Sequence, residues 1–166
     1  MEQKKQIPPR PMWNDEMNRE LIQFTIGQIE EWDNNDHSIG AIPDFFERFT
    51  STHKKQLYYM DGFEIAYFLH NECPIYADTD LVLSLDKVAP QAETILNEAV
   101  TKWVKDNDIK PKFNNGHIIR VSIDGGDKVP KTIASRRKKT AEYVVYGAER
   151  QRIIIPFEDV HSLEAE

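Results

Sequence analysis

The stretch EYVVYGAERQRIII, residues 142–155, predicts a β-hairpin. Its two halves, 142–146 and 152–155, are rich in Tyr, Val and Ile, and the segment between them begins with a glycine. Residues 118–123 form another run of this kind, followed by the turn sequence Asp124-Gly125-Gly126-Asp127. We therefore expect a mostly antiparallel sheet in the C-terminal half of the chain.

The part of the chain before this sheet favours helices. Apolar residues at helical spacing predict helices over 15–33, 42–52 and 90–106. Residues 81–85 are a short apolar run, which we interpret as a strand. Because helices gather early and strands late, the expected fold class is α+β, with the sheet covered by about three helices.

The stretch 56–69 fits two structures. Asp61-Gly62 lies between runs of aromatic and β-branched residues, which is typical of a tight hairpin turn. A helix over 63–72 is the competing interpretation. We favour the hairpin, which would add two strands to the sheet.

The chain divides into three parts by composition. Residues 1–12 contain Pro8, Pro9 and Pro11, so we expect an extended Pro-rich arm. Residues 13–157 are expected to form a single α+β domain, since a chain of 166 residues matches one ordinary domain. Residues 158–166 are expected to be an acidic tail.

Composition narrows the class of protein and its compartment. Hydrophobic residues make up 40% of the chain and charged residues 30%, as in globular domains. Cys73 is the single cysteine, so no intrachain disulfide can form, and a reducing compartment is expected. No apolar run approaches the roughly 18 residues of a membrane helix, and residues 1–5 lack the apolar core of a signal peptide. We expect a soluble, cytoplasmic protein that does not bind membranes.

Charge is distributed unevenly along the chain. The formal net charge is −7, which disfavours broad attraction to nucleic acid. Residues 13–51 carry nine acids against Arg19 and Arg48, whereas residues 128–139 carry six bases and no acid. This segregation suits oriented docking on a partner, including head-to-tail contact between copies of the chain. The alternative is simple solvation of both faces.

The basic segment is expected to be an exposed loop between strands. Its candidate partner-binding or nucleic-acid-binding residues are Lys128, Lys131, Arg136, Arg137, Lys138 and Lys139. These side chains can neutralise phosphates, with Tyr143 and Tyr146 near enough in sequence to stack on bases. The loop can equally order on an acidic protein surface, or serve only solubility.

Few features of the sequence point to catalysis. Asp78 and Asp80 are candidates for a divalent metal site, as in a small metal-dependent nuclease, because such cations favour clustered carboxylates. They also suit a turn ahead of residues 81–85. No catalytic constellation and no phosphate-binding, dinucleotide-binding or other cofactor motif is recognised, so no cofactor is expected.

We therefore favour a non-enzymatic interaction protein. Its expected role is a structural or accessory subunit of a larger assembly, such as a virion, in which case it would occupy the host cytoplasm or the particle. The basic loop would contact a neighbouring protein or another copy of the chain, together with the arm residues Pro8, Pro9, Arg10 and Pro11. The alternatives are a nucleic-acid-binding accessory protein that uses 128–139 and, third, the metal-dependent nuclease.

Overall fold

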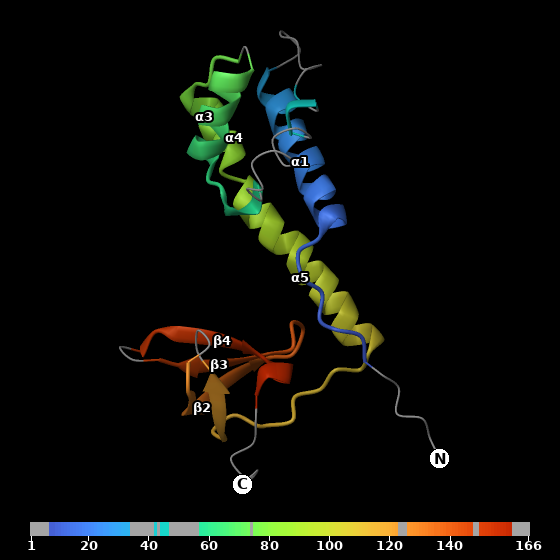
Figure 1. The fold of residues 1–166 in the computed structure, drawn as a ribbon, viewed down its shortest axis with the longest axis vertical. Coiled ribbons are helices and arrows are strands. Elements are labelled where there is room, and N and C mark those ends of the chain that lie inside the picture. The colour runs from blue at the N-terminus through green and yellow to red at the C-terminus, as the bar shows by residue number, and fades with distance from the viewer. Residues whose placement is uncertain are drawn as a thin grey trace. The chain divides into compact units, whose positions relative to one another are not determined.

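Helices come first along the chain and a four-stranded sheet comes last, so the α+β class is confirmed. The computed structural model describes residues 7–33, 42, 44–46, 57–73, 75–122, 126–147 and 150–160. Figure 1 shows α5, Val88–Asp106, as one long continuous helix that precedes the strands along the chain. Among the described residues, no helix has the length and apolar character needed to cross a membrane.

Helix α1, Asp15–Asp33, confirms the helix predicted over 15–33. The side chain of Asn14 starts it by accepting hydrogen bonds from the backbone N–H groups of Glu16, at 3.0 Å, and Met17, at 3.1 Å. Its buried side chains recur every four residues along one face and are Met17, Leu21, Thr25 and Ile29. Of the helix expected over 42–52, residues 42 and 44–46 are helical, and the rest lie outside the described residues.

The hairpin favoured for 56–69 is wrong, and the alternative helix is correct. A 3₁₀ turn, η2 (Leu57–Tyr59), is followed by helix α3, Gly62–Glu72. The Asp61 carboxylate accepts from the Glu64 backbone N–H at 2.8 Å, and the Glu64 carboxylate accepts from the Asp61 N–H at 3.3 Å. This reciprocal pair is a capping box, which starts a helix with the same Asp-Gly sequence that also suits a hairpin.

Gly62 allows α3 to approach the end of the next helix closely. Its N–H donates to the Asp86 carboxylate at 3.0 Å. A Cβ atom at this position would lie 2.5 Å from both Asp86 Oδ1 and the Val82 carbonyl oxygen. The glycine is therefore required by helix packing and not by a turn.

The strand expected over 81–85 is also wrong, because these residues belong to helix α4, Thr79–Leu85. The Asp78 carboxylate caps this helix by accepting from the Leu81 N–H at 2.9 Å. Leu81 and Leu85, four residues apart, are both fully buried. An apolar run of this length fits either element, and the cap decides between them.

The sheet is an antiparallel meander in the order β1-β2-β3-β4. Its strands are β1 (Ile118–Ser122), β2 (Lys128–Arg137), β3 (Glu142–Tyr146) and β4 (Arg152–Pro156), followed by the 3₁₀ turn η4 (Phe157–Asp159). The two strands of the predicted 142–155 hairpin are confirmed, and so is the strand predicted over 118–123 for its described residues, 118–122. The basic segment 128–139 is not a loop, since residues 128–137 are strand β2 and the turn to β3 follows.

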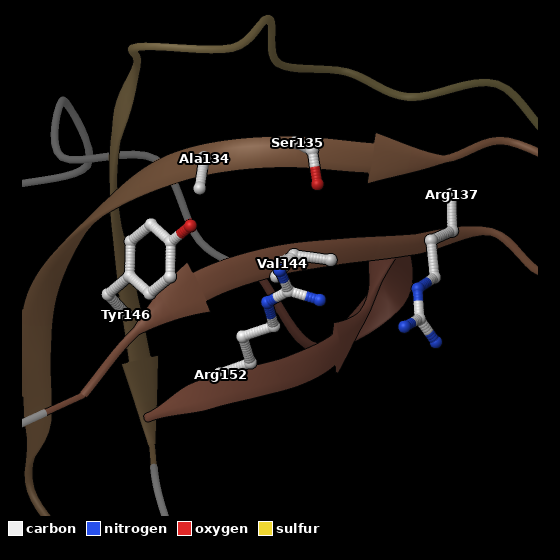
Figure 2. Close-up of a pocket in the computed structure, with 6 residues that line it drawn as sticks. All are labelled: Ala134, Ser135, Arg137, Val144, Tyr146 and Arg152. Carbon is white, nitrogen blue, oxygen red and sulfur yellow. The ribbon is translucent and has the colours of Figure 1, made fainter. Parts of the chain in front are cut away.

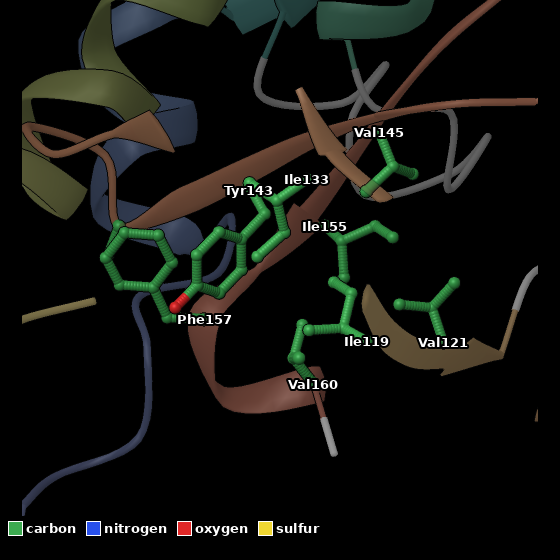
Figure 3. Packing of buried hydrophobic residues seen from close by; sticks show 9 residues of the cluster. Ile119, Val121, Ile133, Tyr143, Val145, Ile155, Phe157 and Val160 are labelled. Atoms are coloured by element: carbon green, nitrogen blue, oxygen red, sulfur yellow. The ribbon is translucent and has the colours of Figure 1, made fainter. Parts of the chain in front are cut away.

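One side of the sheet forms a buried apolar cluster (Figure 3). Side chains from all four strands meet there, among them Ile119, Ile133, Tyr143, Val145 and Ile155. Trp103 and Val104 from the end of α5 pack against this cluster. The fully buried Tyr143 accepts a hydrogen bond at its hydroxyl oxygen from the Phe113 backbone N–H, at 2.9 Å. The polar end of the tyrosine is thereby satisfied inside the core.

Residues of the Pro-rich arm contact the sheet of their own chain. The Trp103 indole N–H donates to the Pro8 carbonyl oxygen at 3.0 Å. The Arg10 guanidinium donates to the carbonyl oxygens of Thr140, at 2.6 Å, and Ala141, at 3.3 Å, in the turn between β2 and β3. It also forms ion pairs with Glu142 at 3.3 Å and Glu158 at 3.2 Å. Arg10 therefore links the arm to the end of the sheet.

The chain groups into two compact units. One unit comprises Met1–Pro11 with Asn97–Glu166, and the other comprises Met12–Leu96. We call these the sheet unit and the helical unit. The sheet unit contains 16 basic and 12 acidic residues, for a net charge of +4, whereas the helical unit contains five basic and 16 acidic residues, for −11. The charge segregation expected from the sequence thus follows the division of the fold.

Candidate functional site

The side of the sheet opposite the buried cluster is the candidate site. Because side chains alternate along a strand, β3 directs Tyr143 and Val145 into the cluster and directs Val144 and Tyr146 to the opposite side. The register places Ser135 of β2 opposite Val144, and Arg152 of β4 opposite Tyr146. We call this side of β2, β3 and β4 the open face.

The open face contains a shallow hollow of about 220 Å³, shown in Figure 2. Val144 lies at its centre, with Tyr146 and Arg137 on either side, and the Arg152 side chain points toward Val144. The residues that line the hollow come from three strands and are Ala134, Ser135, Arg137, Val144, Tyr146 and Arg152. The pairing register of β2 with β3 shifts between Ile133 and Ser135, as in a β-bulge. Ala134 is therefore an extra residue of β2 at the rim of the hollow.

The electrostatics of the hollow are positive. Arg152 is exposed, and no described carboxylate forms an ion pair with it. The nearest carboxylate to Arg137 is Glu142, at 3.8 Å. Glu142 is already bound by Arg10 at 3.3 Å and by the Thr140 hydroxyl at 2.7 Å. Its negative charge is therefore shared among several donors, and both arginines remain able to bind an anion.

The six predicted basic residues do not lie on one surface, because four of them alternate between the two sides of β2 and two lie in the turn after it. Arg137 lies on the open face beside the hollow, and Lys128 lies on the same side of the strand near its start. Lys131 and Arg136 point to the other side, where Arg136 donates to the Asn114 side chain at 2.8 Å. Lys138 and Lys139 are exposed in the turn after β2. The expectation of one continuous basic loop is thus corrected by the alternation of a strand.

The two tyrosines proposed for stacking have different environments. Tyr143 is fully buried, so the expectation that it stacks on a ligand is wrong. Tyr146 is 49% exposed and lines the hollow, so it is the tyrosine of the pair that a ligand can reach. Sequence reasoning missed Arg152, which the register of β3 with β4 places across from Tyr146. Arg152 is the single charged residue of the predicted strand 152–155, and this was the available signal.

The metal-site candidates lie in the helical unit. The carboxylate oxygen of Asp78 that caps α4 also accepts from the Trp32 indole N–H at 3.0 Å, and Asp80 lies in the first turn of α4. In the described part of the chain, no three His, Cys, Asp or Glu side chains come together as a possible metal site. Asp78 therefore has a structural role in linking α1 to α4.

Comparison of the chain with protein-family models and with curated proteins finds no match. The chemistry of the open face consequently rests on its own residues. Two guanidinium groups supply planar, paired N–H donors, a serine hydroxyl supplies another donor, and a tyrosine ring supplies a stacking surface. This set can bind phosphate groups and the aromatic rings attached to them.

Proposed function

We propose that this chain is a non-enzymatic, nucleic-acid-binding accessory protein that docks through its open face. The observation that supports this most directly is the grouping of Arg137, Arg152 and the half-exposed Tyr146 around one hollow. Arginine binds phosphate oxygens in pairs of parallel hydrogen bonds, and an exposed aromatic ring accepts any base by stacking. Lys128, Lys138 and Lys139 add positive charge on the same strand and turn.

The overall negative charge is compatible with this function because the two units differ in sign. The sheet unit has a net charge of +4, and the helical unit has −11. Charges farther apart than about 10 Å are largely screened at ordinary ionic strength, so a polyanion at the open face responds mainly to the local arginines and lysines.

The test is the salt dependence of binding to a nucleic acid. The double variant Arg137→Gln/Arg152→Gln removes two positive charges from the open face. For a single strand, the slope of log affinity against log salt should become shallower by about 0.7 for each phosphate that these arginines neutralise. The control Lys105→Gln/Lys110→Gln makes the same charge change at two exposed lysines of the sheet unit, outside the hollow.

The control variant should keep the slope of the unmodified chain. Equal slopes for the two double variants would mean that the nucleic acid binds elsewhere than on the open face. Failure of the unmodified chain to bind any nucleic acid at low salt would remove the proposed function altogether.

Assembly with other copies is a second candidate function, favoured by the opposite charges of the two units. The helical unit also exposes aromatic side chains, including Phe63 and Tyr67, which are four residues apart on α3. Aromatic groups within an acidic surface suit contact with the basic sheet unit of another copy. Such a subunit could belong to a larger particle such as a virion. Light scattering should then give a mass above 19.4 kDa that falls toward the monomer as salt is raised.

A further inference from the structure

We propose that the hollow on the open face holds one nucleotide of a single-stranded nucleic acid. The base would stack on Tyr146, and the phosphates that follow it along the strand would bind Arg152 and Arg137. This inference rests on the proposed function and specifies the form of nucleic acid and the contact that selects it. It follows from the size of the hollow, from the placement of the arginines and from the exposure of the tyrosine.

The size of the hollow favours one unit of a polymer over a free small molecule. Its volume is about 220 Å³, and it opens on the surface of a sheet. Pockets that enclose a whole small ligand are usually about 300–1,000 Å³. A hollow below that range is too small to bury a drug-sized ligand, but it can accommodate one segment of a chain that continues over the surface on both sides.

The two arginines begin at diagonally opposite positions of the hollow, and both of their side chains lie on the Val144 side of Tyr146 (Figure 2). Arg152 pairs with Tyr146 on β3, whereas Arg137 pairs with Glu142, four residues earlier on the same strand. Four residues of a strand span about 14 Å, and β2 and β4 are about 10 Å apart across β3. The flexible arginine side chains shorten that separation, since Arg152 points back toward Val144 (Figure 2). A strand of nucleic acid that crosses the hollow from Tyr146 toward Arg137 would therefore meet the ring first and then the two guanidinium groups in turn.

Tyr146 makes the site selective for unpaired bases. Tyr146 is 49% exposed and lines the hollow together with the buried Val144. Bases in a duplex are stacked on one another and turn only their edges outward, so they cannot lie on a ring on a sheet surface. A single strand offers free base faces, and stacking on an aromatic side chain tolerates any base.

The experiment separates stacking from charge. Binding of a labelled oligothymidylate of about 12 nucleotides is measured by fluorescence anisotropy. It is compared with an abasic oligomer of equal length, a duplex of equal length and inorganic phosphate. The variants are Tyr146→Ala, Tyr146→Phe and, as the matched control, Tyr76→Ala, which removes a ring that is 80% exposed in the helical unit. Circular dichroism verifies that each variant is folded.

Tyr146→Ala should weaken binding of the oligothymidylate about tenfold and leave binding of the abasic oligomer unchanged. Tyr146→Phe and Tyr76→Ala should bind like the unmodified chain. Arg152→Gln should weaken binding of both oligomers, because each has the same phosphates. Inorganic phosphate should compete only weakly, since it lacks the base.

The outcomes distinguish this inference from the proposed function. The nucleotide site is contradicted if Tyr146→Ala weakens binding of both oligomers equally or of neither. It is also contradicted if the duplex binds as tightly as the single strand. In both cases the proposed docking by charge is unaffected. Strong competition by inorganic phosphate would likewise overturn the nucleotide site and indicate a simple anion site. If neither oligomer binds at low salt, the proposed function fails together with the inference.

Discussion

Arg10 and Glu142, 132 residues apart along the chain, form an ion pair in which a guanidinium nitrogen lies 3.3 Å from a carboxylate oxygen. The Arg10 side chain is only 17% exposed and also binds the carbonyl oxygens of Thr140 and Ala141. Glu142 in turn is the carboxylate nearest to Arg137 on the open face. The arm therefore stabilises the end of the sheet and at the same time holds the acid that would otherwise neutralise Arg137.

Replacement of Arg10 by alanine should destabilise the chain by about 2 kcal/mol, because a largely buried position then lacks its hydrogen bonds to charged groups. The measurement is urea unfolding followed by circular dichroism. Arg19→Ala, at an exposed position on α1, makes the same substitution as a control and should change the stability little. Equal stability of the two variants would mean that the arm contributes nothing to the fold.

Alanine at two glycines should have opposite effects on stability. Gly62→Ala would place a Cβ atom 2.5 Å from the Val82 carbonyl oxygen, so α3 must move and stability should fall by about 1–3 kcal/mol. Gly27→Ala, in the middle of α1 with nothing within 4 Å of the added atom, should raise stability by about 1 kcal/mol. Thermal unfolding of both variants checks this. If both substitutions changed the stability in the same direction, the packing of α3 against α4 would be contradicted.

Tyr143→Phe should destabilise the sheet unit by about 1–2 kcal/mol, since the Phe113 N–H loses its acceptor. Hydrogen exchange at the Phe113 amide should accelerate at the same time. Tyr76→Phe removes a hydroxyl from a side chain that is 80% exposed and serves as the control. Unchanged exchange at Phe113 would show that the hydroxyl is not the acceptor in solution.

The sequence was informative where a local pattern agreed with the packing. Helix α1 has apolar residues at helical spacing and a capping asparagine, and the 142–155 hairpin has two β-rich runs around a turn. Residues 61–64 satisfied two local patterns at once. In the structure, the start of α3 is held by a hydrogen bond from Gly62 to Asp86, 24 residues away. A contact between residues so far apart cannot be predicted from a local sequence pattern.

The open face was only partly predictable. Strand β2 buries one hydrophobic side chain, Ile133, among outward-facing charges, so its sequence lacks the apolar alternation by which strands are recognised. Pairing with β1 and β3 stabilises it as a strand. The hollow further depends on the register shift after Ile133, which no feature of the sequence indicated.

The most direct test of the open face as the binding surface is nuclear magnetic resonance of the isotope-labelled chain during addition of a single-stranded oligonucleotide. We predict that the backbone amides of Ser135, Val144, Tyr146 and Arg152 shift together with a common affinity, while those of α1 and α3 stay in place. Shifts confined to Met12–Leu96, or no shifts at low salt, would contradict the account.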